Sequence, residues 1–252
     1  MKIIKVKGID FNITDDYKKY SRDELISLYW QSHPRFNFIK NCRKDSVFFD
    51  IGANEGELSF WKGWNKPDRN DIKMHGVDLK IGSYAKNYES FYALNLDKDI
   101  FPYPDNFFDV MFSTHVIEHL NNINFFIKNI FDKLKFGGRV YIESPAKISL
   151  NTPRRQDFID VGFCLSTMNF YDDVTHIAPY DTIGLVDFFK KGGQFEIEES
   201  GSIKNDFLSE LLISYGYENH DSEITTYGLW LKFNWSNYII AKKYETNRIL
   251  EF

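Results

Sequence analysis

Two glycines and two acids stand at spacings that suit a nucleoside-like ligand. A short apolar run ends in the sequence DIGANEG at residues 50–56, and Asp78 follows 22 residues after Gly56. Glycine lets a backbone approach a ligand closely, and an acid at that distance is placed to accept hydrogen bonds from both ribose hydroxyls. These residues predict a turn that binds a nucleoside.

The same spacing disfavours two common phosphate-binding loops. Asn54 stands where the dinucleotide fingerprint G-x-G-x-x-G has its second glycine, and nothing here matches the phosphate loop G-x-x-x-x-G-K. Asparagine tolerates the left-handed conformation better than most residues, so Asn54 is compatible with the turn. The turn therefore predicts a nucleoside site without a pyrophosphate cradle, which disfavours a nicotinamide oxidoreductase.

Histidine is the second chemical signal in the sequence. His115 and His176 are the candidate proton acceptors, because a side chain with a pKa near neutrality suits general base catalysis. Two other roles stay open: His115 as part of a ligand-pocket wall, and His176 as a structural hydrogen-bond donor. His115-x-x-Glu118-His119 also matches an inverted zinc motif. That motif needs both histidines on one helical turn, whereas His115 ends a predicted strand, so we predict no metal site.

Alternating strands and helices must position these residues. Apolar runs predict strands at 47–51, 72–79, 92–97, 107–115, 139–145, 194–200 and 230–244. Helices are expected at 22–33, from 57 onward, at 120–134 ending at the glycine pair 137–138, and at 182–191, with an irregular stretch before residue 230. This order predicts an α/β fold with a mostly parallel sheet and helices on both faces. We expect one domain over 1–252, with an N-terminal helical cap at 15–40 and an insertion at 146–179 on the ligand side.

The amino-acid composition limits the classes of binding partner that we expect. The 252 residues carry a net charge of −5, and their short basic groups are scattered, which makes a nucleic-acid partner unlikely. The 24 Phe and 15 Tyr include rings that could stack on a saccharide. Cys42 and Cys164 are far apart and lack metal-ligand spacing, and no apolar run has the length of a signal peptide or membrane span. We expect a cytoplasmic protein with a small-molecule or saccharide acceptor, and the oligomeric state stays open.

The ordered motifs resemble the class I S-adenosylmethionine-dependent methyltransferases, in their small-molecule or glycan-type branch. The resemblance rests on residues 50–56, the following G-V-D at 76–78, the region 95–110, the H-V-I-E-H-L at 115–120 and the turn at 134–138. It implies a Rossmann-like doubly wound sheet of seven strands with an antiparallel last strand. It also implies S-adenosyl-L-methionine as the cofactor.

The resemblance further implies roles for individual residues. The backbone of the turn would contact the methionine and ribose parts of the cofactor, Asp78 the ribose hydroxyls, and residues 95–97 the adenine, while His115 would lie near the sulfonium. The cofactor-binding residues implied in this way are Asp50, Gly52, Ala53, Asn54, Gly56, Asp78, Asn95, Leu96, Asp97 and His115.

The segment Asp-x-x-Thr-His at 172–176 resembles stretches in methyltransferases of surface-glycan and O-antigen gene clusters. An anionic or saccharide acceptor would be recognised by side chains in and next to this insertion: Arg154, Arg155, Tyr171, His176 and Tyr180. We therefore expect methyl transfer to oxygen, with His115 or His176 as catalytic residues. An RNA or protein methyltransferase and a non-catalytic S-adenosylmethionine-binding scaffold are the alternatives.

Overall fold

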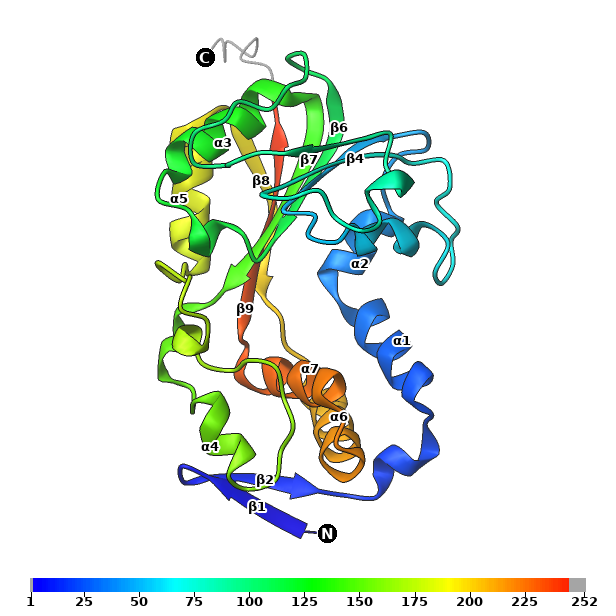
Figure 1. Cartoon of the computed structure of the whole chain (residues 1–252), viewed down its shortest axis with the longest axis vertical. Helices are drawn as coiled ribbons and strands as arrows, with labels where there is room; N and C mark the ends of the chain where they lie inside the picture. The colour runs from blue at the N-terminus through cyan, green and yellow to red at the C-terminus, as the bar shows by residue number, and fades with distance from the viewer. Residues whose placement is uncertain (1, 245–252) are drawn as a thin grey trace, which may run out of the picture. The chain divides into compact units, whose positions relative to one another are not determined.

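The computed structural model describes residues 2–244 and divides the chain into two compact units. The sheet unit comprises residues 38–144, 180–201 and the chain from 238 onward. The helical unit comprises the chain up to residue 37 together with 145–179 and 202–237. Each unit is drawn in Figure 1 with its elements labelled. The expectation that residues 1–252 form a single domain stays a prediction.

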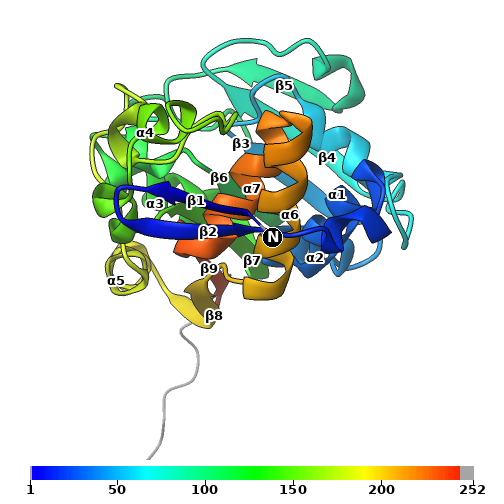
Figure 2. The same ribbon diagram turned by 90° about the horizontal axis from the view of Figure 1, so that it is seen from below.

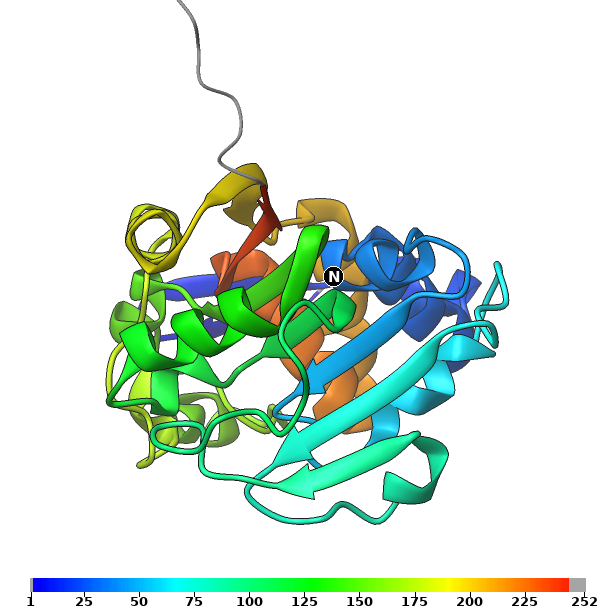
Figure 3. The same ribbon diagram turned by 90° about the horizontal axis from the view of Figure 1, so that it is seen from above.

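The sheet unit is built on seven strands within residues 2–244, in the order β5-β4-β3-β6-β7-β9-β8. Strand β3 pairs in parallel with β4 on one side and with β6 on the other, and β5 and β7 continue in parallel. Figure 3 shows β3, β4 and β5 side by side, coloured from blue to blue-green. The last strand of the chain, β9, runs antiparallel, which confirms the predicted mostly parallel Rossmann-like sheet.

The sheet unit contains the following elements: β3 (Val47–Ile51), η2 (Glu57–Lys62), β4 (Lys73–Asp78), η3 (Ala85–Asn87), β5 (Ser90–Ala93), β6 (Phe108–Thr114), η4 (Ile117–His119), α3 (Ile123–Lys133), β7 (Leu134–Pro145), α5 (Thr182–Gly192), β8 (Phe195–Ser202) and β9 (Ser236–Lys243). The last residues of β7 and β8 and the first two of β9 belong to the helical unit.

Aromatic and aliphatic side chains cover both faces of this sheet. Successive residues of a strand point to opposite faces, so Phe49 packs in the core beneath α3 and α5 while Phe48 contacts the Phe112 ring on the other side. On that second face Phe38, from α2, contacts Phe112 and Tyr141. Helices therefore flank the sheet, as the alternating pattern predicts.

The helical unit consists of a small hairpin and several helices. Its elements are β1 (Lys2–Val6), β2 (Ile9–Ile13), η1 (Asp16–Lys19), α1 (Arg22–Ser32), α2 (Pro34–Lys40, which crosses into the sheet unit), η5 (Lys147–Asn151), α4 (Arg155–Ile159), η6 (Phe170–Asp172), α6 (Asp206–Asn219) and α7 (Ser222–Phe233). Figure 2 shows the antiparallel hairpin β1–β2 close to α6 and α7. Phe11, Phe158 and Trp235 are among the buried residues of this unit's core.

Two predicted helix boundaries match the structure well. The side chain of Ser21 accepts a hydrogen bond from the Glu24 backbone N–H, and Glu24 accepts one from Ser21, which forms the expected capping box of α1. The side chain of Asp181 caps α5 by accepting a hydrogen bond from the Gly184 N–H.

Three expected elements are wrong in their type or limits. The strand expected at 92–97 ends at Ala93, because Asn95 and the acids after it hydrogen-bond to nearby backbone N–H groups and form a turn. The expected strand 230–244 and irregular stretch are instead α6, α7 and β9; a short apolar run cannot by itself distinguish a buried helix from a strand. The glycine pair does not end the helix: α3 ends at Lys133, and β7 passes through a bulge at Gly137, whose φ is +77°.

Candidate functional site

The carboxyl ends of β3 and β6 form the point where the sheet's strand order reverses. From β3 the chain proceeds to β4 and β5 on one side, and later strands lie beyond β6 on the other. Ligands of such sheets bind outside the carboxyl ends of the strands at this point. The glycine turn at 52–56 leaves β3 there, and the residues 115–119 leave β6 beside it.

The glycine turn requires close backbone approach. Gly52 has a φ of +77°, and a Cβ at that position would overlap the Cγ2 of Val116 in the segment after β6. The Gly52 and Ala53 N–H groups donate to the Val77 carbonyl, which fixes the turn against β4. Asn54 adopts a φ of 48°, so the left-handed conformation that asparagine tolerates is the one it uses.

Asp78 at the end of β4 is held beside this turn. One carboxylate oxygen accepts the Asn54 N–H at 2.8 Å, and the other accepts the Leu79 N–H at 2.7 Å. Each carboxylate oxygen has two lone pairs, so both retain capacity for ribose hydroxyls. A cradle of glycine backbone with an oriented acid fits the ribose end of an S-adenosylmethionine-like ligand.

A set of contacts that the sequence analysis did not identify holds the other side of the turn. The Glu55 carboxylate accepts hydrogen bonds from the Ser83 N–H at 2.8 Å and from its hydroxyl at 2.5 Å, and these bonds hold the Glu55 pKa below its usual value. Gly82 lies so close that an added Cβ would be 2.6 Å from the Glu55 carbonyl carbon. Residues 79–84 are therefore fastened to the glycine turn.

Asp50 lies beneath the turn and is 4% exposed. Its carboxylate accepts the Tyr88 hydroxyl at 2.7 Å. Burial and then the negative charge of Asp50 raise the Tyr88 pKa far above its usual range, so the phenol stays a donor. The role expected for Asp50, contact with the methionine ammonium, stays a prediction.

The residues expected near the adenine are engaged in local structure. Leu96 is 7% exposed and packs in the core of the sheet unit. Asp97 accepts hydrogen bonds from the backbone N–H groups of Asn121 and Asn122; although burial alone would raise its pKa, these bonds lower it. The side chain of Asn95 accepts the Asp97 N–H. These three residues fasten the loop after β5 to the start of α3.

His115 stands between two carboxylates. Its φ of 55° places it in the left-handed region directly after β6. Its Nδ1 lies 3.5 Å from Glu118 and its Nε2 lies 3.3 Å from Glu143, which also accepts the Tyr141 hydroxyl at 2.7 Å. Burial lowers the His115 pKa, but the two carboxylates outweigh it, and the net shift is upward. His115 is thus stabilised as an imidazolium.

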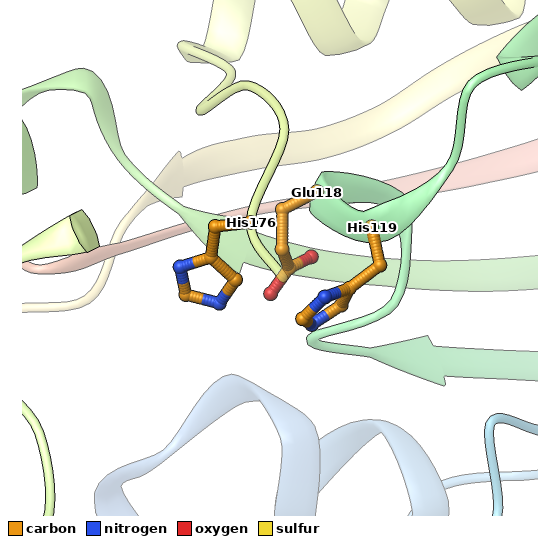
Figure 4. A group of neighbouring side chains, drawn as sticks. All are labelled: Glu118, His119 and His176. Atoms are coloured by element: carbon orange, nitrogen blue, oxygen red, sulfur yellow. The ribbon is translucent and has the colours of Figure 1, made fainter. Parts of the chain in front are cut away.

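Figure 4 shows Glu118 and His119 side by side on η4. Glu118 is fully buried, and neither of its carboxylate oxygens has a hydrogen-bond partner among residues 2–244. Neither Glu118 nor Glu143 was assigned a role by the sequence analysis. The only available signal was the H-x-x-E-H pattern, which was considered as a zinc motif. His115 and His119 do not share a helix, because η4 begins at Ile117.

Four of the five residues expected to bind the acceptor lie in the helical unit. His176, drawn in Figure 4, is buried in its loop, and its Nδ1 lies 2.6 Å from the Phe170 carbonyl oxygen. A carbonyl can only accept, so Nδ1 is the donor of this hydrogen bond, and Nε2 lies 3.9 Å from the Asp173 carboxylate. The Arg154 guanidinium lies over the exposed Tyr171 ring, 5.1 Å from its centre. Arg155 Nε donates to the Leu165 carbonyl.

Tyr180 belongs to the sheet unit. Its ring packs against Phe188 of α5. Burial and then the charge of Glu118 raise its pKa, which places its hydroxyl within the electrostatic reach of that carboxylate.

Comparison with known proteins identifies the fold's family. Residues 50–142 match the model of a methyltransferase domain. The chain thus contains a methyltransferase domain, in the range that carries the resemblance to the class I S-adenosylmethionine-dependent methyltransferases. This range of the methyltransferase runs from the acid before the glycine turn to the middle of β7. It contains the turn, Asp78 and the His115 segment.

Known methyltransferases match over most of the chain. Phosphoethanolamine N-methyltransferase of Triticum aestivum is 27% identical over 194 residues, which cover 70% of this chain and 36% of the wheat protein; the chain thus spans about a third of that relative's length. An S-adenosylmethionine-dependent methyltransferase of Archaeoglobus fulgidus aligns with a TM-score of 0.52 and 24% identity, covering 89% of this chain and 96% of the other. Phosphoethanolamine N-methyltransferase 2 of Haemonchus contortus, in complex with S-adenosyl-L-methionine, aligns with a TM-score of 0.58 and 16% identity, covering 91% and 59%.

The expected methyltransferase domain and its S-adenosylmethionine cofactor are confirmed by these matches. No helix within residues 2–244 combines the length and the apolar character needed to cross a membrane. The individual site residues stay predictions.

Proposed function

We propose that this protein transfers a methyl group from S-adenosylmethionine to an oxygen of a saccharide or other small-molecule acceptor, as in surface-glycan or O-antigen biosynthesis. The observation that carries the donor half is the glycine turn with Asp78 at the reversal point of the sheet. When bound, S-adenosylmethionine supplies an electrophilic methyl group on a sulfonium, so alignment of the acceptor provides much of the catalysis.

In this proposal the sheet unit binds the donor. Gly52, Ala53, Asn54 and Gly56 present backbone to it, and Asp78 accepts the ribose hydroxyls. Asp50, Asn95, Leu96 and Asp97 contribute mainly by fixing the surrounding loops, because their side chains already hold local hydrogen bonds or core positions.

His176 is the better proton acceptor of the two candidate histidines. With Nδ1 donating to a carbonyl, the Nε2 lone pair is the one that can take the proton of an acceptor hydroxyl. The oxygen then forms its bond to the methyl carbon, and the carbon–sulfur electron pair returns to sulfur. The two carboxylates raise the His115 pKa and favour its protonated form, so we assign it to the wall of the donor site.

Arg154 and Tyr171 support a saccharide acceptor that carries negative charge. An exposed aromatic ring can stack on a sugar, and the guanidinium held over that ring offers a planar fork of donors to a phosphate or carboxylate. Arg155 is proposed to shape the same acceptor region, and Tyr180 remains a proposed acceptor-binding residue of the sheet unit. We further propose a cytoplasmic location, supported by the free thiols of Cys42 and Cys164.

A small amine is the second candidate acceptor. It is favoured by the 27% identity to the wheat phosphoethanolamine N-methyltransferase. In that reaction the nitrogen lone pair attacks the methyl carbon and the nitrogen's proton passes to a base of the protein.

The donor half is tested by calorimetry with S-adenosylmethionine and S-adenosylhomocysteine. Asp78→Ala should weaken both by at least about tenfold, because two charge-assisted hydrogen bonds to the ribose are lost. Asp187→Ala, which removes an exposed acid from α5, serves as the control. Absence of binding by the wild type, or equal affinity in Asp78→Ala, contradicts the proposal.

The acceptor half is tested with methyl-labelled S-adenosylmethionine. The wild type is incubated separately with sugar nucleotides, with glycans of the host and with phosphoethanolamine, and labelled products are identified by mass spectrometry. Label on a saccharide oxygen supports the first candidate, and label on nitrogen supports the second. Donor binding without transfer to any acceptor would favour the scaffold alternative, and label in RNA or protein would favour those acceptors.

A further inference from the structure

Glu118 is a buried acid whose carboxyl oxygens lack hydrogen bonds. It is 0% exposed, and neither oxygen accepts a hydrogen bond from any residue between 2 and 244. Within those residues its ion pair is with His115 Nδ1, at 3.5 Å, and a ring nitrogen of His119 lies within 4.8 Å. A buried carboxylate normally requires hydrogen bonds and a dedicated cation, because its loss of hydration is costly.

His115 cannot supply that compensation alone. Its other nitrogen lies 3.3 Å from Glu143, so one imidazolium is shared by two carboxylates. Carboxylates at both ring nitrogens favour the doubly protonated form of His115. The group of His115, Glu118 and Glu143 therefore places two acids against one base in the interior of the sheet unit.

The position of this group favours the cationic part of the donor. Asp78 lies on the β4 side of the glycine turn and orients the ribose there. The methionine part must then extend across β3 toward β6, where Gly52 packs directly against Val116. Val116 is between His115 and the η4 helix that carries Glu118. The sulfonium of the donor carries a positive charge. Methyl transfer removes this charge and leaves a neutral sulfur.

We propose that Glu118 is a specificity-determining residue for donor charge, whose carboxylate favours the sulfonium of S-adenosylmethionine over the uncharged sulfur of S-adenosylhomocysteine. This inference rests on S-adenosylmethionine being the donor. A charge-sensitive Glu118 would also favour release of the product. The attraction between its carboxylate and the sulfonium disappears when the methyl group is transferred.

The experiment compares the two ligands in the same protein by calorimetry. Glu118→Gln removes the charge and keeps the shape, so the ratio of the S-adenosylhomocysteine Kd to the S-adenosylmethionine Kd should fall by about tenfold. Glu118→Asp keeps the charge and should retain most of the preference. Glu196→Gln, an exposed acid on β8, is the matched control and should leave the ratio unchanged.

An unchanged ratio in folded Glu118→Gln, or equal weakening of both ligands, overturns the inference. Failure of the wild type to bind either ligand would contradict the donor assignment itself, and the two failures are therefore distinguishable. A wild-type measurement decides the question if the variants do not fold. The wild type should bind S-adenosylmethionine more tightly than S-adenosylhomocysteine, and equal affinity for the two ligands overturns the inference.

Discussion

At the scale of single residues, the chemistry of this protein is set by what each ionisable side chain faces. Two histidines that look alike in the sequence have different partners. His115 has carboxylates at both nitrogens, whereas His176 Nδ1 donates to a carbonyl and its Nε2 lies 3.9 Å from Asp173. The first geometry raises the pKa of His115. Hydrogen-bond partners, rather than residue type, therefore separate a pocket wall from a candidate base.

Glu143→Gln should lower the His115 pKa, because one of the two carboxylates that raise it is removed. The folded-state pKa lies above the ordinary value of 6.5, so the stability that His115 contributes is fully present below about pH 6.5 and is lost as the pH rises through the raised value. The variant should therefore lose more stability at pH 6 than at pH 9.

Nuclear magnetic resonance titration of the His115 ring and urea unfolding at the two pH values test this expectation. Glu198→Gln, which breaks the surface pair with Arg139, provides a control without contact to His115. Equal destabilisation by Glu143→Gln at both pH values would show that His115 is not held as a cation.

At the scale of elements, the site depends on close backbone contact between loops from neighbouring strands. The turn after β3 touches the segment after β6 through Gly52 and Val116, and it touches the loop after β4 through Glu55, Gly82 and Ser83. Side chains are absent or small where these loops meet. The glycines are therefore needed both to shape the turn and to let the loops approach each other.

Gly82→Ala should weaken S-adenosylhomocysteine binding and lower the melting temperature. The new methyl group would lie 2.6 Å from the Glu55 carbonyl carbon, and backbone cannot yield as a flexible side chain can. Overpacking of this kind costs about 1–3 kcal/mol, or about 2–12 °C for a chain of this size. Thermal unfolding and calorimetry measure both effects.

Gly63→Ala is the matched control, because its Cβ would meet only the Asn70 side chain at 4.0 Å. Equal melting temperatures and affinities for Gly82→Ala and wild type would contradict the proposed contact between residues 79–84 and the glycine turn.

At the scale of the whole molecule, two compact units are connected by a chain that passes between them at 37–38, 144–145, 179–180, 201–202 and 237–238. Each unit has its own buried core. The proposed donor residues belong to the sheet unit, and His176, Arg154 and Tyr171 belong to the helical unit. A single domain should unfold cooperatively, in one transition. The single-domain prediction can therefore be tested by measuring thermal unfolding.

We expect one calorimetric unfolding transition. S-Adenosylhomocysteine at about 100 times its Kd should raise the midpoint by roughly 5–11 °C, because it adds about 2.7 kcal/mol to the native state. Adenosine at the same concentration, lacking the homocysteine part, should raise it less. Two transitions, of which only one shifts with ligand, would contradict the single-domain prediction.

The sequence by itself determined the donor side of this protein. DIGANEG, Asp78 and the alternation of apolar strands with amphipathic helices are local patterns, and their chemistry follows from backbone conformation and spacing. They were sufficient to predict the parallel sheet, the family and the cofactor. Their success reflects the fact that a glycine turn after a buried strand has few alternative conformations.

Only the tertiary structure decided which polar groups share an environment. Glu143 is 28 residues from His115 in the sequence, yet the parallel pairing of β6 and β7 brings them together. Likewise, Glu55 meets Ser83 and Asp50 meets Tyr88 through loops whose paths no local pattern specifies. Charge and hydrogen bonding act through space, so the raised pKa of His115 and the buried carboxylate of Glu118 became visible only once the strands were paired.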